Sequence, residues 1–448
     1  MTIRRFLPIL LAGSALVGIS PALAQEPAPA PASNAMSAED DAARTASLEA
    51  QVRSLQEQLD ALKAQLGSTT PSWKGAPQWQ DKDEGWSFKP RGRLQVDAGW
   101  VGRPDGITDR GLGFSNEVRR ARLGVEGSIP GGFGYKFELD FADNEVEITD
   151  AILTYDFAPE AGLTIGQHNN FQSLEELTSS RFSSFVERAA FTDAFNFERR
   201  LGLSASYAMG DVTVNAGLFT DNVNDLADDD NNSLSVDGRI VYAPKLGSTQ
   251  LHFGGSAHFR DSKDLIEIGA TTRYRQRPLI HSTDVRFLAT PAMPVEKETS
   301  YGLELAAIHG PFHAAGEAHW LKAKRPGGVS DPTFFGGYAE IGYFITGETR
   351  GYKGGAFDRT KVLRPVSEGG PGAFQVNLRY DYLDLIDAGI VGGRQKGYQA
   401  SLIWIPHDHV RFLLDYGRMV YDDAAIPTPG GDRDYGVDVI GARAQVDF

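Results

Sequence analysis

Strict two-residue alternation of apolar and polar side chains recurs in many runs between Trp86 and the last residue of the chain. In residues 94–98 the apolar side chains are even-numbered, whereas in residues 135–141 they are odd-numbered. Successive side chains of a β-strand point to opposite faces, so each run has one apolar and one polar face. The same alternation recurs, between clusters of Gly, Asp and Asn that are typical of turns, in residues 374–382, 398–404 and 410–416. The pattern predicts an all-β domain.

Three features favour a transmembrane antiparallel β-barrel over a soluble sandwich, which also alternates. Charged residues occupy the second face densely, as a water-filled lumen permits. The final run, 440–448, alternates up to a terminal Phe448, which resembles the outer-membrane assembly signal of β-barrels. Aromatic residues near strand ends match the interfacial girdles of a membrane barrel, as at Trp100, Tyr155, Phe157, Trp320 and Trp404.

The barrel segment, residues 86–448, is 363 residues long. At about 10 residues per strand plus turns and loops, this length fits 16 strands, and 18 would also fit. A barrel of 16 strands leaves an aqueous channel. Gaps rich in Asp, Asn or Gly are expected to be outer loops: Asn222 to Ser233, Lys324 to Asp331, Glu368 to Gly372 and Asp422 to Asp434.

The N-terminus predicts export. Arg4 and Arg5 precede an apolar stretch from Phe6 to Ile19, and Ala22-Leu23-Ala24 provides small residues for a cut before Gln25. A basic start, a short apolar region and such a site are typical of a secretory signal peptide, here residues 1–24. A Pro/Ala-rich linker follows over residues 25–36.

Residues 37–67 have the pattern of a helix, with a capping pair at Ser37 and Asp40 and an expected end at Gly67. Its apolar residues form a heptad seam at Leu48, Val52, Leu55, Leu59, Leu62 and Leu66. A seam this short is marginal in isolation, which suggests a periplasmic coiled coil in an oligomer. The alternative is a single amphipathic helix lying on another surface. A polar linker, residues 68–85, joins the helix to the barrel.

Composition excludes several classes of function. The chain has no cysteine, so disulfides, zinc–thiolate sites and cysteine nucleophiles are excluded. The net charge of −15 becomes −17 once Arg4 and Arg5 leave with the signal, which argues against nucleic acid as a partner. Net charge is a sum over the whole surface, so the lumen can carry the opposite sign.

Arginines gather on the polar faces of the first two strands. Arg91 and Arg93 share parity with Gln95 and Asp97, and Arg120 and Arg122 share parity with Glu126. These four arginines are therefore expected to face the lumen. Arg119 has the opposite parity, so it must lie on a bulge or at the end of the strand, or else face lipid at a high cost.

A second group, Arg273, Arg275 and Arg277, has the spacing of a row of guanidiniums on one strand face. Arginine rows attract anions, because the guanidinium charge is fixed and its planar fork matches phosphate and carboxylate oxygens. The alternative is that the arginines only neutralise lumen carboxylates, which include Glu126, Glu138, Asp140 and Asp150.

Several short motifs, taken in order, resemble the phosphate-selective porin O and P family. Residues 88–95, FKPRGRLQ, are similar to its first strand, and residues 119–127, RRARLGVEG, to its second. Residues 150–155 and 174–181 resemble its constriction-loop region, and residues 346–352, TGETRGY, a signature of a late strand.

The resemblance implies a homotrimer of 16-strand barrels, each narrowed by an inward-folded third loop. It implies a phosphate site made by Arg93, Arg119 and Arg120 with the loop serines Ser179 and Ser180. It also implies an arginine ladder, which the row at residues 273, 275 and 277 resembles.

One departure bears on selectivity. The best-known phosphate-specific members carry a lysine where this chain has Glu176, and a carboxylate there would repel phosphate. Asp150 is a further lumen carboxylate. The sequence therefore predicts an outer-membrane porin for small anions, phosphate or polyphosphate-like solutes favoured. The alternative is a general small-solute porin with an envelope-tethering role, through peptidoglycan, for the N-terminal helix.

Other chemistry has little support. No G-x-S-x-G elbow is present, so no enzyme is expected. His407 and His409 have a turn-like setting that favours a solvated turn over a metal site, and the acidic run Asp228 to Asn232 lacks the Gly and Glu of a calcium loop. We expect no metal or cofactor. The expected partners are small anions, outer-membrane lipid and lipopolysaccharide, and the barrel assembly machinery.

Overall fold

The structure is a computed structural model that describes residues 38–69, 71–73, 75–81, 84–104, 106–225, 233–267 and 269–448. The chain divides into two units, Met1–Leu66 and Gly67–Phe448. The predicted signal peptide, residues 1–24, and the predicted linker, residues 25–36, lie outside the described residues.

Helix α1 (Ala38–Thr69) is the first described element. It covers the predicted helix except for Ser37, which lies outside the described residues, and it continues past the expected end at Gly67. A glycine inside a helix costs only about 1 kcal/mol relative to alanine, so Gly67 need not end it. Four seam residues are 49 to 64% exposed: Leu48, Val52, Leu55 and Leu59. Nowhere in the described residues is a helix both long and apolar enough to cross a membrane.

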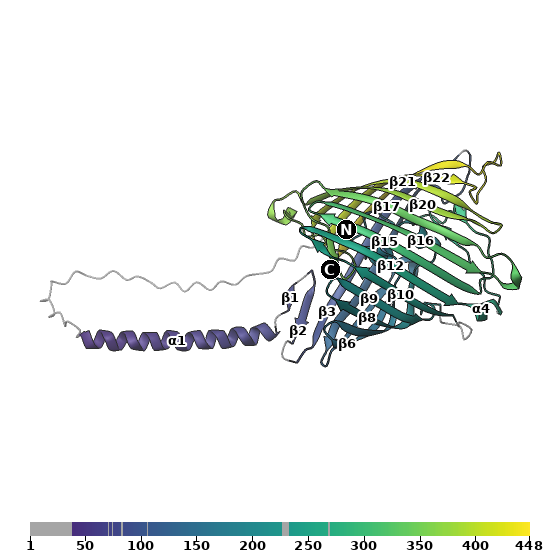
Figure 1. Cartoon of the computed structure of the whole chain (residues 1–448). Coiled ribbons are helices and arrows are strands. Elements are labelled where there is room, and N and C mark those ends of the chain that lie inside the picture. Colours follow the sequence, from purple (N-terminus) through teal and green to yellow (C-terminus); the bar gives the residue numbers. More distant parts are fainter. Residues whose placement is uncertain are drawn as a thin grey trace, which may run out of the picture. The chain divides into compact units, whose positions relative to one another are not determined.

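The second unit is a closed antiparallel β-barrel of 16 strands, as the sequence predicts (Figure 1). Each strand pairs with its neighbours in chain order, and the last strand pairs with the first, through Ala442 opposite Ala98 for example. The strands are β3 (Ser87–Val101), β4 (Gly113–Ile129), β5 (Phe133–Asp140), β6 (Glu147–Ala158), β7 (Ala161–Asn169), β8 (Arg199–Met209), β9 (Val212–Phe219), β10 (Leu234–Tyr242), β12 (Thr249–Asp261), β15 (Lys297–His309), β16 (Phe312–Lys324), β17 (Thr333–Phe344), β20 (Ala373–Asp387), β21 (Ile390–His407), β22 (Val410–Asp422) and β23 (Tyr435–Asp447).

Side-chain parity decides which face of each strand turns inward. On β3, Leu94 and Val96 are exposed on the outer face, whereas Arg93, Gln95 and Asp97 are buried on the inner face. Apolar outer residues suit contact with lipid, and polar inner residues suit a wet lumen. The alternation in the sequence thus becomes the two surfaces of the barrel wall.

The predicted linker, residues 68–85, contains ordered structure. Strands β1 (Ser72–Trp73) and β2 (Pro77–Gln80) form a small hairpin, and β2 extends the pairing of β3 through Trp79 opposite Phe88. The rings of these two residues lie 5.9 Å apart, so part of this segment belongs to the barrel unit.

Connections alternate between a short-turn end and a long-loop end of the barrel. Three of the predicted outer loops lie at the long-loop end, within connections 220–233, 325–332 and 423–434. The prediction for Glu368 to Gly372 is wrong, because these residues belong to connection 345–372 at the short-turn end. The residue composition identifies a segment as a connection between strands. The end of the barrel at which the connection lies depends on how many strands precede it.

Three connections fold into the barrel and supply much of its buried apolar core, including Val186, Phe191, Leu279, Phe287 and Phe357. They are residues 170–198, 262–296 and 345–372. The first contains α2 (Leu174–Leu177) and α3 (Ala190–Ala194). The second contains α4 (Lys263–Glu267), β13 (Arg275–Gln276) and β14 (Leu288–Ala289). The third contains β18 (Gly351–Lys353), β19 (Ala356–Asp358) and the short helix η3 (Val366–Glu368). The remaining short elements are β11 (Lys245–Leu246), η1 (Ala142–Asn144) and η2 (Pro326–Gly328).

Candidate functional site

Connection 170–198, called here the inward loop, is held against the inner wall by carboxylates. Asp415 accepts a hydrogen bond of 2.6 Å from the backbone N–H of Val186, and Asp381 accepts one of 2.9 Å from that of Ala190. Wall residue Glu317 caps helix α2 by accepting bonds of 3.0 and 2.7 Å from the N–H groups of residues 174 and 175. These bonds satisfy donors that a buried loop would otherwise leave unpaired.

Arginines from other parts of the barrel bind the carbonyl groups of the same loop. Arg411 donates to the carbonyls of Arg181 and Ser183. Arg350, from connection 345–372, donates to the carbonyl of Phe182 and to the hydroxyl of Ser184. The expectation that this loop folds inward to narrow the pore is therefore supported by contacts along its length.

A cavity of 310 Å³ lies between the inward loop and strands β3 to β8, and we call it the cation cavity. Its lining contains eight basic side chains: Arg91, Arg93, Arg120, Arg122, Lys136, Arg181, Arg188 and Arg199. Two carboxylates, Asp150 and Glu176, line it as well, together with Ser179 and Ser180. Four of the five residues of the predicted site, Arg93, Arg120, Ser179 and Ser180, thus meet at this cavity, whereas Arg119 does not line it.

Arg93 and Arg120 differ from the other cationic residues of this cavity because all of their hydrogen-bond partners are neutral. Arg93 donates a hydrogen bond of 2.8 Å to the hydroxyl of Ser180, and Arg120 donates one of 2.8 Å to the side-chain oxygen of Gln95. Both arginines are buried, and neither has a carboxylate within ion-pair distance among the described residues. The Nε atom of Arg93 has no hydrogen-bond partner in the described part of the chain. A buried charge without a direct ion-pair partner is costly, so an anion in contact with these guanidiniums would stabilise the pair.

Arg119 faces the lumen because of a β-bulge. The register of β3 with β4 shifts between Gln95 and Val96, so that Arg119 is the extra residue between Val118 and Arg120. Its guanidinium pairs with Glu187 of the inward loop at 2.8 Å. Of the alternatives that parity left open, the bulge is correct.

Several other arginines are neutralised by carboxylates, as the alternative interpretation expected. Arg122 pairs with Asp140 at 2.7 Å and with Glu138 at 3.3 Å. Asp150 lies between Lys136 at 2.5 Å and Arg199 at 3.1 Å, so its charge is balanced within the wall. Arg91 pairs with Glu126. Neutralisation thus applies to part of the cluster and leaves Arg93 and Arg120 without a direct ion-pair partner among the described residues.

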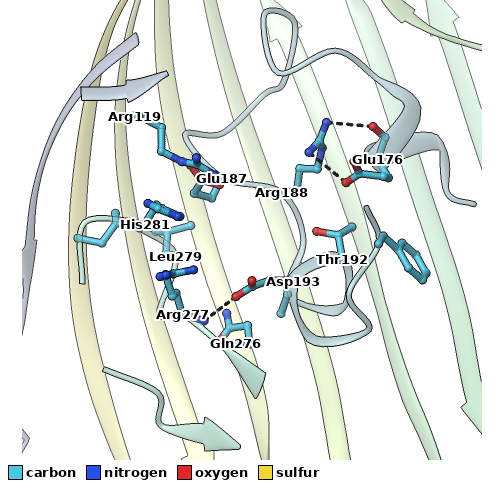
Figure 2. A pocket seen from close by; sticks show the side chains of 13 residues that line it. Arg119, Glu176, Glu187, Arg188, Thr192, Asp193, Gln276, Arg277, Leu279 and His281 are labelled. Carbon is cyan, nitrogen blue, oxygen red and sulfur yellow. Dashed lines mark hydrogen bonds and ion pairs between the residues drawn. The ribbon is translucent and has the colours of Figure 1, made fainter. Parts of the chain in front are cut away.

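A second cavity, of 170 Å³, lies between the inward loop and connection 262–296, and we call it the loop cavity (Figure 2). The residues that line it include three arginines, Arg119, Arg188 and Arg277. They also include three carboxylates, Glu176, Glu187 and Asp193, so the positive and negative charges of these six side chains are equal in number. Figure 2 shows these side chains around the cavity, with Arg119 coming from strand β4, Arg277 from connection 262–296 and the others from the inward loop.

The two loop glutamates differ in their ionisation. Burial opposes the charge of Glu187, but the guanidiniums of Arg119, Arg443 and Arg120 outweigh it and hold its pKa well below its usual range. Burial raises the pKa of Glu176, although Arg188, Arg199 and Arg120 oppose this. Glu187 is therefore a fixed counter-charge, whereas Glu176 is easier to protonate.

The row of three arginines does not lie on a barrel strand. Arg273, Arg275 and Arg277 belong to connection 262–296, where only Arg275 and Gln276 are in a short strand, β13. Arg273 and Arg275 are exposed, and Arg277 lines the loop cavity with its backbone N–H bonded to Asp193 at 3.0 Å. The spacing was compatible with a wall strand, but Tyr274 between them is fully buried and ties this segment to β15 through Glu298.

Sequence reasoning missed four cationic residues of the cavity, Lys136 on its strand and Arg181, Arg188 and Arg199 in or beside the inward loop. Arg181 closes the quoted loop motif, but Arg188 and Arg199 lie further along the chain, outside it. Their only signal was that basic residues recur in a segment that was expected to face the lumen. Lys136 alternates with the apolar residues of its strand, which would have placed it on the inner face.

The remaining candidates carry little chemistry. Phe448 continues the ladder with β3 by exchanging backbone bonds of 3.0 and 3.1 Å with Gly92, where an added Cβ would meet the phenyl ring at 2.1 Å. His407 and His409 lie at a turn with ring centroids 5.7 Å apart. The acidic run at residues 228–232 lies outside the described residues. Among the described residues, no group of three or more His, Asp or Glu side chains has the geometry of a metal site.

A closed barrel with an apolar exterior and a charged lumen, narrowed by an inward loop, defines an outer-membrane channel. Comparison with known families agrees: the chain belongs to the phosphate-selective porin O and P family, which matches residues 88–448.

Individual relatives extend this result. The chain is 27% identical to Porin O of Pseudomonas aeruginosa over 410 residues, which covers 81% of this chain and 89% of Porin O. It is 52% identical over 388 residues to an uncharacterized protein of Caulobacter vibrioides, covering 85% of this chain and 77% of that protein. The solved structure of outer-membrane expressed OmpT of Vibrio cholerae is similar in fold with a TM-score of 0.50, at 10% identity, covering 82% of this chain and 99% of OmpT.

Proposed function

We propose that this porin passes small anions by passive diffusion through the cation cavity and favours phosphate and related oxyanions. The observation that carries the proposal is the pair Arg93 and Arg120, which are buried with only neutral hydrogen-bond partners. An oxyanion between them would supply the direct ion-pair partner that each of them lacks. Lumen charge sets the selectivity of pores, and the excess of basic residues around this pair adds to its attraction for anions.

The hydroxyls of Ser179 and Ser180 complement the two guanidiniums. Ser180 accepts a bond from Arg93, and Ser179 accepts one of 3.2 Å from Arg181. Each hydroxyl can also donate its own proton to a solute oxygen. Neutral donors beside positive charges would hold an anion without binding it so tightly that it cannot leave. The role is diffusion and involves no catalysis.

Helix α1 supports a homotrimer in this proposal. Its exposed heptad seam fits the seams of identical helices in neighbouring copies. The barrel begins at its short-turn end, which faces the periplasm in outer-membrane barrels, so the preceding helix would also be periplasmic. A tether to peptidoglycan is a second candidate role for the same exposed seam. Deleting residues 38–66 would distinguish them: loss of trimers supports the coiled coil, and loss of envelope attachment alone supports the tether.

Titration of chloride current with phosphate tests the proposed preference. Purified protein in a planar bilayer should show a chloride conductance that falls saturably as phosphate is added. The reason is that phosphate would remain longer than chloride between the two arginines. A conductance that phosphate leaves unchanged would contradict the oxyanion preference and favour a general small-solute porin.

A further inference from the structure

We infer that the ion pair of Glu176 with Arg188 is the partition between the loop cavity and the cation cavity, and that Glu176 determines which anions cross it. Its carboxylate occupies the place on Arg188 that a travelling anion must take. This inference rests on the proposed anion path and specifies its selective step.

The position of the pair is the first evidence. Of the described residues, Glu176 and Arg188 are the two that line both cavities. Their charged groups are 3.0 Å apart, and Figure 2 shows the carboxylate and the guanidinium facing each other beside the loop cavity. A solute that moves from one cavity to the other therefore meets this pair.

Arg188 is the fixed member of the pair. Its guanidinium donates bonds of 2.9 Å to each of the carbonyls of Glu175 and Glu176 and one of 3.1 Å to the carbonyl of Thr178. These bonds fasten it to the end of helix α2. The carboxylate of Glu176 accepts no hydrogen bond from another side chain besides this arginine among the described residues, so it is the member that can turn away.

The charges around Glu176 explain why it would select among anions. Arg120 and Arg199 of the wall act on its carboxylate together with Arg188, so the glutamate behaves as an anion already bound in the cluster. A solute must compete with it for these guanidiniums. A phosphate ion carries more charge than chloride and can accept bonds from two guanidiniums, so it competes better. The site therefore favours multivalent oxyanions over halides.

Removing the charge of Glu176 tests the inference. Glu176→Gln keeps the shape of the side chain and the backbone contacts of Arg188. We expect the chloride-to-potassium permeability ratio to rise about threefold or more, because a negative charge next to the path is lost. The matched control is Asp261→Asn, which removes the same charge from an exposed pair with Lys297 that lines neither cavity.

A second variant tests the partition itself. Glu176→Asp keeps the charge but shortens the reach toward Arg188, so we expect a higher single-channel conductance at an almost unchanged permeability ratio. If neither variant differs from the wild type, and the wild type is anion-selective, the inference is wrong while the proposed function stands. A cation-selective wild type would instead overturn the proposed function.

Discussion

The guanidinium of Arg93 donates a 2.8 Å hydrogen bond to the hydroxyl of Ser180, a residue 87 positions later in the chain. This bond joins the first barrel strand to the inward loop. Both side chains line the cation cavity. The bond orients the guanidinium of the buried Arg93, whose Nε has no hydrogen-bond partner among the described residues. The relationship explains why a strand arginine and a loop serine belong to one site.

Arg93→Gln should weaken phosphate binding in the pore. The substitution removes a buried charge whose hydrogen bonds to an anion are worth about 1.5–3 kcal/mol, so the phosphate concentration that halves chloride current should rise about tenfold or more. Phosphate titration in planar bilayers measures this. Arg418→Gln is the control, since Arg418 forms an exposed pair with Asp438 and lines neither cavity. An equal shift in both variants would count against the site.

Asp415→Leu should loosen the inward loop. The N–H of Val186 loses its acceptor, and a buried unpaired donor costs about 1–3 kcal/mol. We expect a higher and noisier single-channel conductance with weaker ion selectivity. Asp415→Asn retains an oxygen that can accept the same bond and should stay close to the wild type. Identical conductance in the leucine variant and the wild type would show that this anchor does not hold the constriction.

Acidification should increase anion selectivity. The pKa of Glu176 is raised by burial, so the carboxyl gains its proton at a higher pH than an ordinary glutamate, whose pKa is about 4.3. As pH falls through this raised pKa, one negative charge disappears from the cation cavity. Glu187 remains ionised over the same range because its pKa is held low. Reversal potentials against pH measure the effect. The Glu176→Gln variant should show a smaller rise because it lacks this carboxyl group, and a rise equal to that of the wild type would refute the assignment.

Leu55→Asp should destabilise the oligomer. Leu55 is 64% exposed on helix α1 at a seam position, where a charge would be buried against the helices of other copies. We expect fewer trimers by native mass spectrometry of the full chain. Ser54→Asp places the same charge outside the seam and should leave the trimer intact. A trimer population unaffected by Leu55→Asp would rule out the coiled coil.

Much of the barrel was predictable because strand parity is a local property. The alternation around Leu94 and Val96 placed Arg93 inside, and the broken parity of Arg119 correctly allowed for a bulge. Local patterns could not place the connections. Glu368 to Gly372 has the composition of an outer loop, yet lies at the short-turn end, where its connection folds back into the barrel.

The site was predictable only in part, because its contacts are long-range. The motif pointed to Ser179 and Ser180, but the pairing of Arg188 with Glu176 depends on how the inward loop folds back on itself. The row at residues 273, 275 and 277 shows the converse. Its spacing suits a strand, but the burial of Tyr274 between the arginines places the segment in a connection and not in the wall.

The reversal potential of the wild-type pore under a potassium chloride gradient tests the central claim most directly. Arg93 and Arg120, buried with only neutral hydrogen-bond partners, predict a chloride permeability greater than that of potassium. A pore that prefers potassium would contradict the proposed anion path through the cation cavity.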